Sequence, residues 1–344
     1  ANVMNTAVMT PAFTGPRPSL RASRGPRSRN TASTANVASV AMIHSISKKR
    51  SNRAPALVTS LPNTLCASRC GGLRSPGTFV RSRRNAATAQ TATAATAMVA
   101  GLAMRVAVIS DIHANYHALE TVLAEIDAAR VDVVWCLGDT VGYGPRPNDC
   151  CETVKSRAEQ SLVGNHDLVV LGELAVSDFN DEAAAAATWT ASVLTEQSRA
   201  FLAGLEPCAS LDGVELFHAS ARDPVWEYVL TEEAAHATLE LAEAPLVLVG
   251  HSHVALALAL DGETVAGGLA PGGTEVQLSG RWLLNPGSVG QPRDGDPRAA
   301  WLLLDLQRRF AAFHRVAYPI EKTQSEMRER RLPPALAARL ERGE

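Results

Sequence analysis

Short runs of apolar residues recur along residues 104–344, and each run ends at a glycine or a polar residue. The runs that predict buried strands are 105–110, 131–137, 161–163, 214–218 and 246–250. Between the first two, residues 117–129 carry apolar side chains at helical spacing, which predicts an amphipathic helix. A second helix is expected to start near Pro147. The repeated order of strand, loop and helix predicts a parallel βαβ core.

The pattern changes in the second half of the chain. Short strands separated by Gly-rich turns between residues 254 and 305 predict an antiparallel second sheet. Residues 299–305 and 310–318 predict a hairpin, and 321–341 predict a helix that Pro333 and Pro334 interrupt. The segment from about 168 to 207 has helical spacing, including an Ala-rich helix from Asp181 to Leu194, and we expect it to cap the functional site.

Residues 1–103 show no hydrophobic period. They contain 14 Lys and Arg and no Asp or Glu, and they are rich in Ser, Ala and Arg, which predicts a disordered basic extension. Three interpretations fit this composition: an organellar transit peptide, a basic arm for RNA or membrane, or translated upstream sequence before a start at Met104 or, less favoured, Met98. The upstream interpretation is favoured because the globular pattern begins abruptly after Met104.

The charge of residues 104–344 restricts the partners that we expect. The remaining 19 basic and 35 acidic residues give this part a net charge of −16, which repels nucleic acid unless bound cations offset it. No apolar run approaches the roughly 18 residues that span a bilayer. The six cysteines form no paired metal-ligand pattern, which is typical of a reduced cytoplasmic protein. We expect a small-molecule substrate, no membrane contact and no nucleic acid, with the oligomeric state open and a homodimer included.

Polar residues with metal-binding side chains follow the predicted strands directly. They are Asp111, His113, Asp139, Asn165, His218, His251 and His253. Since the carboxyl ends of parallel strands meet at one edge of a sheet, we expect these side chains to converge. Seven donors are too many for one tetrahedral ion and suit two ions about 3.5 to 4 Å apart that share a carboxylate. Oxygen and imidazole donors without thiolate indicate Mn, Fe, Zn, Ni or Co.

Two such ions favour phosphoester hydrolysis. They lower the pKa of a bridging water, so that a metal-bridging hydroxide can attack the phosphorus in line, and they offset the charge that develops there. His166, beside Asn165, is expected at the rim, where an imidazolium can protonate the leaving oxygen. Asp167 is expected to fix the tautomer of His166 and to raise its pKa.

The ordered blocks Asp-x-His, Gly-Asp, Gly-Asn-His-Asp, His and Gly-His-x-His resemble the signature of the calcineurin-like metallophosphoesterases, and the resemblance extends over residues 104–318. It implies a four-layer α/β/β/α sandwich of two mixed sheets. It also implies that Asp111, His113, Asp139 and His253 bind one metal. Asp139, Asn165, His218 and His251 would bind the second metal, and His166 would be the catalytic acid.

Two further segments resemble a prokaryotic branch of small phosphodiesterase-like proteins. They are residues 138–145, Gly-Asp-Thr-Val-Gly-Tyr-Gly-Pro, and residues 285–290, Asn-Pro-Gly-Ser-Val-Gly. Protein Ser/Thr phosphatases and symmetrical dinucleoside tetraphosphatases of the family carry Asp-Arg-Gly after the Gly-Asp block, and this Arg is absent here. The resemblance to the branch therefore implies a phosphodiesterase acting on small-molecule or nucleotide phosphoesters. The alternatives are a phosphomonoesterase or phosphoprotein phosphatase and, less favoured, a non-catalytic scaffold of the same fold.

The candidate substrate contacts have structural alternatives. Asn115 could contact substrate or make local backbone hydrogen bonds in a turn. Arg222 could contact phosphate with Asp223 in support, or form a loop salt bridge. Arg293 and Arg298 present the same choice, with a structural role slightly favoured.

Overall fold

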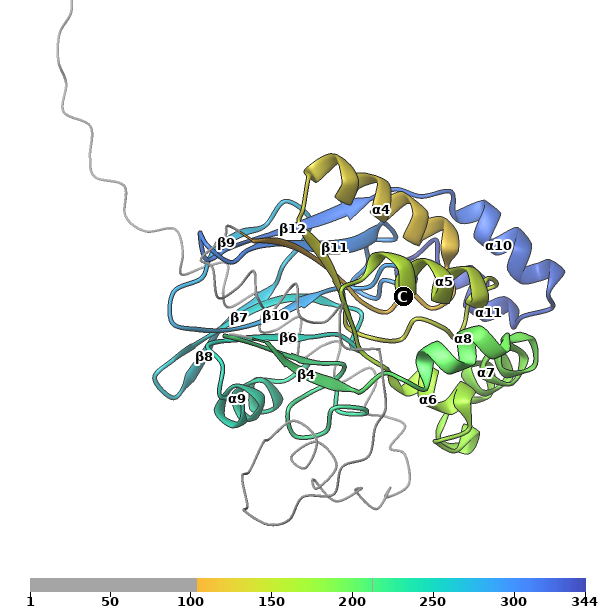
Figure 1. Cartoon of the computed structure of the whole chain (residues 1–344), viewed down its shortest axis with the longest axis horizontal. Helices are drawn as coiled ribbons and strands as arrows, with labels where there is room; N and C mark the ends of the chain where they lie inside the picture. The colour runs from red at the N-terminus through yellow and green to blue at the C-terminus, as the bar shows by residue number, and fades with distance from the viewer. Residues whose placement is uncertain (1–103, 212) are drawn as a thin grey trace, which may run out of the picture.

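The computed structural model describes residues 104–211 and 213–344, and the extension predicted over 1–103 lies outside these residues. Two mixed six-stranded sheets pack face to face, with helices on both outer sides (Figure 1). The α/β/β/α sandwich that the family resemblance implied is therefore confirmed. Within the described residues, no helix combines the length and the apolar character that crossing a membrane requires.

The first sheet has the order β3-β2-β1-β11-β12-β9. Its strands are β1 (Arg105–Ile109), β2 (Val133–Cys136), β3 (Gln160–Ser161), β9 (Glu275–Gln277), β11 (Ala299–Asp305) and β12 (Phe310–Val316). β1, β2 and β3 are parallel, and β11 joins the other edge of β1 in the antiparallel sense. The predicted hairpin of β11 and β12 is present.

The second sheet has the order β4-β5-β6-β10-β7-β8. Its strands are β4 (Cys208–Leu211), β5 (Val214–Phe217), β6 (Leu246–Val249), β7 (Ala255–Asp261), β8 (Thr264–Leu269) and β10 (Arg281–Pro286). β5, β6 and β10 are parallel, whereas β4, β7 and β8 are antiparallel to their neighbours.

The prediction that residues 254–305 form a separate antiparallel sheet is wrong. β9 and β11 belong to the first sheet, where β11 pairs with β1, while β7, β8 and β10 extend the parallel strands of the second sheet. The cause is that β11 is apolar from Ala299 to Leu304 and is buried along its whole length, on both faces. Its partner is therefore decided by long-range packing and not by local spacing.

Helices cover the outer faces of the sheets and gather at one end of the sandwich (Figure 1). They are α4 (Tyr116–Ala129), α5 (Pro147–Arg157), α6 (Asn165–Leu171), the 3-10 helix η1 (Val176–Asp178), α7 (Asp181–Val193), α8 (Glu196–Leu202), α9 (Glu232–Leu241), α10 (Ile320–Glu329) and α11 (Pro334–Arg339). α6, α7 and α8 form the helical segment expected between 168 and 207, and α10 ends before the two prolines, as predicted.

The alternation of side chains along β1 explains the layers. Val106 and Val108 point between the sheets, where they pack in a core that includes Leu248. Ala107 and Ile109 point outward and pack against α4. On the far side, α9 covers the outer face of the second sheet. Because successive side chains of a strand face opposite ways, one apolar strand supplies two packed layers.

Candidate metal centre

All seven predicted donors lie directly after strands or at the start of the helix that follows one. Asp111 and His113 follow β1, Asp139 follows β2, and Asn165 begins α6 after β3. His218 follows β5, and His251 and His253 follow β6. The carboxyl ends of parallel strands from both sheets therefore supply the cluster, as expected for open α/β sheets.

The structure brings these side chains together in two overlapping groups. One group contains Asp111, His113, Asp139 and His253, and the other contains Asp139, His218 and His251. Within each group the possible donor atoms lie within 4.8 Å of one another. Asn165 joins the second group, since its Oδ1 is 3.3 Å from His218 Nε2. None of the seven residues is more than 3% exposed.

The histidine rings are held with their donor atoms turned into the cluster. The Nδ1 atoms of His113, His218 and His253 lie 3.2, 2.8 and 2.6 Å from the backbone oxygens of Val141, Leu137 and Gln291. A carbonyl oxygen only accepts, so each Nδ1 carries the proton and each Nε2 presents a lone pair. The Nε2 atoms of His113 and His253 are 2.9 Å apart, and a cation between them relieves their repulsion.

His251 has the opposite ring arrangement. Its Nε2 lies 3.1 Å from the backbone oxygen of Trp226, and Tyr228 stacks on the ring at a centroid distance of 4.0 Å. Nε2 therefore carries the proton, and Nδ1 is the atom left to bind a metal. The sequence gives no sign of this difference, because Trp226 lies in a distant loop.

The two carboxylates each use one oxygen for the backbone and turn the other into the cluster. Asp139 Oδ1 accepts the His166 N–H at 2.9 Å, while Oδ2 is buried without a hydrogen bond. That Oδ2 lies 3.6 Å from both His113 Nε2 and His218 Nε2, midway between the two groups. Asp111 Oδ2 accepts the His251 N–H at 3.1 Å, and its Oδ1 is likewise buried without a hydrogen bond, 3.4 Å from His253 Nε2.

Burial makes this cluster electrostatically unfavourable without cations. Desolvation raises the pKa of Asp111 to about 7 and raises the pKa of Asp139 well above its usual value. It also lowers the pKa of His113 and His251 well below the usual value. Bound cations stabilise both the ionised carboxylates and the neutral imidazoles, so the donor set fits metal ions.

The backbone of the ligand loops is strained. Five of the seven donor residues have a positive φ, with Asp111 at 53°, Asp139 at 51° and His251 at 60°; His113 and His253 are the others. Left-handed conformations of non-glycine residues are unfavourable and persist only where the surroundings enforce them. Hydrogen bonds between the loops supply that constraint, such as Asp111 N–H to Gly138 O at 3.0 Å.

Gly164 is required by the close approach of Asp139. A Cβ at this position would lie 2.1 Å from Asp139 Oδ1. Only glycine allows the backbone before α6 to reach the carboxylate that both groups share. The Gly in the Gly-Asn-His-Asp block therefore has a steric origin in the site itself.

His166 and Asp167 are both buried at the site, but Asp167 does not contact the ring of His166. The Asp167 carboxylate instead accepts backbone N–H groups from Gly164, Thr140 and Val141 at 3.0, 3.2 and 2.9 Å. The expectation that Asp167 fixes the His166 tautomer is thus corrected. The reason is that Asp167 occupies the third position of α6 and caps that helix.

The surroundings of His166 are mainly aromatic. Its ring lies 4.3 Å from the ring centroids of Tyr143 and of Phe179, and its Nδ1 is buried without a hydrogen bond. Burial, followed by the charge of Arg293, lowers the pKa of His166 well below its usual value. The neutral ring can still donate a hydrogen bond.

The two expected substrate contacts have other partners. Asn115 is 2% exposed, its amide donates to Gly290 O and the Tyr318 hydroxyl, and its Oδ1 accepts from Ala118 N–H and the Thr323 hydroxyl. It caps α4, which is the structural alternative. Arg222 forms ion pairs with Glu227 and, at 3.6 Å, with Glu233. Its role is therefore a loop salt bridge.

Arg293 lies beside the site, although its sequence position favoured a structural role. Its guanidinium donates to Gln291 Oε1 at 2.8 Å and to the Tyr143 hydroxyl at 3.4 Å. Its charge lowers the pKa of His113, His166 and His251, although burial is the larger cause for each. Only its position three residues after the Asn-Pro-Gly-Ser-Val-Gly segment could have indicated this role.

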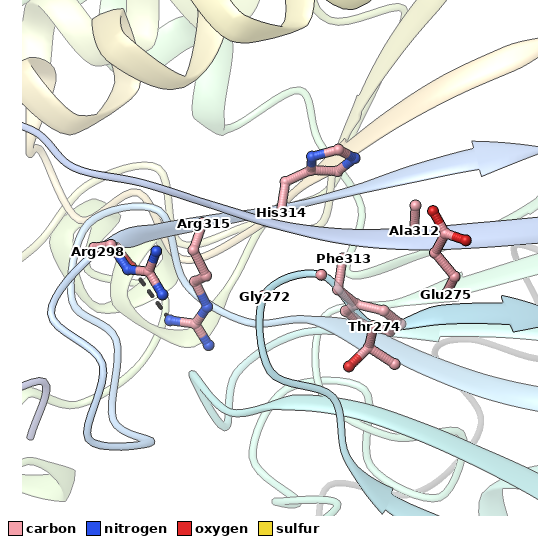
Figure 2. A pocket seen from close by; sticks show the side chains of 9 residues that line it. Gly272, Thr274, Glu275, Arg298, Ala312, Phe313, His314 and Arg315 are labelled. Carbon is pink, nitrogen blue, oxygen red and sulfur yellow. Dashed lines mark hydrogen bonds between the residues drawn. The ribbon is translucent and has the colours of Figure 1, made fainter. Parts of the chain in front are cut away.

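A separate hollow lies on the outer strands of the first sheet, and none of the seven donors lines it (Figure 2). Its lining includes Arg298, Phe313, His314 and Arg315, and Phe313 and His314 leave β12 on opposite sides. Arg315 is paired with Asp294, and Arg298 with Asp296. These ion pairs neutralise the arginines, so the hollow does not compete with the metal centre as a phosphate site.

Comparisons with known proteins agree with this geometry. An uncharacterised protein of Methanocaldococcus jannaschii is 36% identical over 240 residues, which cover 68% of this chain and 96% of that protein. A crystal structure of a metallophosphoesterase from Sphaerobacter thermophilus superposes with a TM-score of 0.65 at 41% identity, covering 71% of this chain and 100% of the other. A hypothetical protein of Pyrococcus horikoshii OT3 shares the fold, with a TM-score of 0.56 and 17% identity over 70% of this chain and 99% of that one.

The family assignment comes from the sequence of the folded part. Residues 104–309, which supply all seven donors and Arg293, match the family model described as the calcineurin-like phosphoesterase superfamily domain. The chain therefore belongs to the calcineurin-like phosphoesterase superfamily, a family of metal-dependent phosphoester hydrolases.

Proposed function

We propose that this protein is a dinuclear metal-dependent phosphodiesterase that acts on small-molecule or nucleotide phosphoesters. The observation that carries the proposal is the buried Oδ2 of Asp139, which lacks a hydrogen bond and lies 3.6 Å from one histidine of each donor group. A single carboxylate oxygen in this position suits two ions that share it.

The donors divide between two ions, with Asp139 common to both. Asp111, His113 and His253 would hold one ion, and Asn165, His218 and His251 the other. When bound, two divalent ions supply Lewis acidity at the phosphoryl oxygens and lower the pKa of water at the site. Mn, Fe, Zn, Ni and Co all suit these donors.

The remaining catalytic work falls to His166. We propose that the negative charge of the bound phosphoester favours the protonated ring, and that this imidazolium transfers its proton to the leaving oxygen as the phosphorus–oxygen bond breaks. The alcohol then departs neutral and His166 is left as neutral imidazole. The rings of Tyr143 and Phe179 pack against the His166 ring and hold it in place. Asp167 acts through the backbone, because it ties the loop of Asp139 to the start of α6.

A phosphodiester is favoured over a phosphoprotein because residues 140–145 lack the Asp-Arg-Gly that protein phosphatases of this family carry after the Gly-Asp block. The net charge of −16 over residues 104–344 also disfavours long nucleic acids. Phosphomonoesters remain the second candidate, because Arg293 adds positive charge beside the site.

One assay tests the proposal. The protein is stripped with chelator, reloaded with Mn, Ni or Zn, and given bis-p-nitrophenyl phosphate or p-nitrophenyl phosphate. We expect metal-dependent hydrolysis with a higher kcat/KM for the diester. A preference for the monoester would replace the diesterase by a phosphomonoesterase, and no hydrolysis with any metal would favour a non-catalytic scaffold.

A further inference from the structure

Two arginines meet at one amide oxygen beside the metal centre. Arg293, in the loop after β10, donates to Gln291 Oε1 at 2.8 Å, and Arg339, the last residue of α11, donates to the same oxygen at 3.5 Å. Two guanidinium groups that share one neutral acceptor repel each other. Burial, followed by the charge of Arg293, lowers the pKa of Arg339.

Neither guanidinium has an acidic partner. Among the residues that the structure describes, no carboxylate oxygen lies within 4.0 Å of Arg293 or Arg339, whereas Arg222, Arg298 and Arg315 each form an ion pair. Partly buried cations are usually paired, because desolvated charge is costly. Asp111 acts on Arg293 and Glu182 on Arg339 only from beyond ion-pair distance, so no carboxylate of the described residues contacts the Arg293–Arg339 pair.

Gln291 and Tyr143 connect the two arginines to the metal donors. The backbone oxygen of Gln291 holds the His253 ring at 2.6 Å, and the Arg293 N–H donates to His253 O at 3.1 Å. The Arg293 guanidinium stands 5.7 Å from the centre of the Tyr143 ring, which is itself 4.7 Å from the ring of His113. An anion held by the arginines would thus sit beside the reacting phosphoryl group and not in its place.

Packing of the C-terminal segment fixes the position of Arg339. Leu336 and Ala337 of α11 share a hydrophobic cluster with Tyr143, and Gly295 N–H, in the loop after Arg293, donates to Gly343 O at 3.0 Å. This segment lies beyond the residues 104–309 that match the family. Arg339 is consequently held beside Arg293 by the docking of the C-terminal segment.

We propose that Arg293 and Arg339 form an anion subsite that binds a second phosphate of the substrate, next to the phosphate ester that is cleaved. The substrate class is a phosphoester that carries a further phosphate group. That the phosphate ester beside this subsite is cleaved rests on the proposed function. Guanidinium groups suit phosphate because they present paired N–H donors to its oxygens.

Calorimetric binding to the metal-loaded full chain tests the subsite. The probes are thymidine 5'-monophosphate and thymidine 3',5'-bisphosphate, which differ by one phosphate. We expect wild type to bind the bisphosphate about tenfold more tightly, as one charge-assisted contact predicts. Arg339→Gln lowers this ratio toward one. Arg339→Lys, which keeps the charge but loses the paired donors, gives an intermediate ratio.

Arg342→Gln is the matched control, because Arg342 lies near Arg339 but pairs with Glu344. It keeps the wild-type ratio. Should Arg339→Gln fail to fold, Arg293→Lys is measured instead and is expected to lower the ratio as well. Equal affinities of the two probes in wild type, or an unchanged ratio in both Arg339→Gln and Arg293→Lys, would overturn the subsite.

The same measurement separates this inference from the proposed function. Loss of hydrolysis of every nitrophenyl ester, with the binding ratio intact, would end the hydrolase proposal and leave the subsite standing. Hydrolysis of the nitrophenyl diester, together with equal binding of the two thymidine probes, would support the hydrolase proposal and overturn the subsite.

Discussion

At the scale of single residues, the two oxygens of one carboxylate have different tasks. Asp139 Oδ1 accepts a backbone N–H from the start of α6, and Oδ2 faces both donor groups. The position of Asp139 after an apolar strand and a glycine was readable from the sequence. The sequence could not show which of its oxygens accepts from the backbone, because the donor is the His166 N–H, 27 residues away along the chain.

Asp139→Asn should abolish binding of both ions while the fold is retained, because a neutral amide supplies neither the charge nor two anionic oxygens. Elemental analysis of the purified variant, with circular dichroism as the check on folding, measures this. Asp178→Asn is the control, since Asp178 is exposed in η1 and belongs to neither donor group. Retention of about two ions per chain in Asp139→Asn would contradict the shared-ligand assignment.

His166→Ala should lower kcat by about 10²- to 10⁴-fold, the usual contribution of a general acid, without changing metal content. Steady-state kinetics on the nitrophenyl diester, paired with elemental analysis, tests this. His236→Ala is a matched control, because His236 pairs with Glu240 on the surface of α9. Unchanged turnover in His166→Ala would remove its catalytic role.

At the scale of elements, the strand ends and the helix starts position the site together. Gly164 ends the loop after β3 and begins α6, which brings Asn165, His166 and Asp167 to the edge of the sheet. Sequence spacing located these elements well, since the helix expected over 117–129 spans Tyr116–Ala129. It could not pair β11 with β1, because sheet partners that are far apart in sequence are chosen by tertiary packing.

Neighbours in sequence also proved a poor guide to contacts. Asp167 follows His166 directly, yet their side chains have different partners because successive helical residues do not face each other. Conversely, residues far apart in sequence can contact the same atom, as Arg293 and Arg339 do. They are 46 residues apart, and only the docking of α11 beside Tyr143 brings them to one oxygen.

Gly164→Ala should lose metal while most of the fold survives, because its Cβ would lie 2.1 Å from Asp139 Oδ1 and displace that carboxylate. Metal content and thermal unfolding of the variant test this. Gly204→Ala serves as the control, since the nearest atom to its added Cβ is 3.5 Å away. Full metal occupancy in Gly164→Ala would show that the shared carboxylate tolerates displacement.

At the scale of the whole molecule, the metal centre joins the two sheets. The first sheet supplies Asp111, His113 and Asp139, and the second supplies His218, His251 and His253. Ions bound between them cross-link the two halves of the sandwich. Without ions, burial of these side chains is unfavourable, because desolvation is the main cause of the raised pKa of Asp111 and of the lowered pKa of His113.

Removal of metal should therefore lower the thermal unfolding temperature, and Mn should restore it in proportion to the logarithm of its free concentration. A ligand that binds only the folded state stabilises by about 2.7 kcal/mol at 100 times its Kd. Differential scanning calorimetry of chelated and reloaded protein measures this effect. Identical unfolding temperatures would mean that the ions do not bind the folded state in preference to the unfolded chain.

Crystallography of the Mn-loaded protein, with anomalous scattering to locate the ions, tests the central claim most directly. We predict two anomalous peaks about 3.5 to 4 Å apart, with Asp139 Oδ2 bound to both. His251 should contact its ion through Nδ1, and His113, His218 and His253 should contact theirs through Nε2. A single peak, or two peaks that do not share Asp139, would contradict the account.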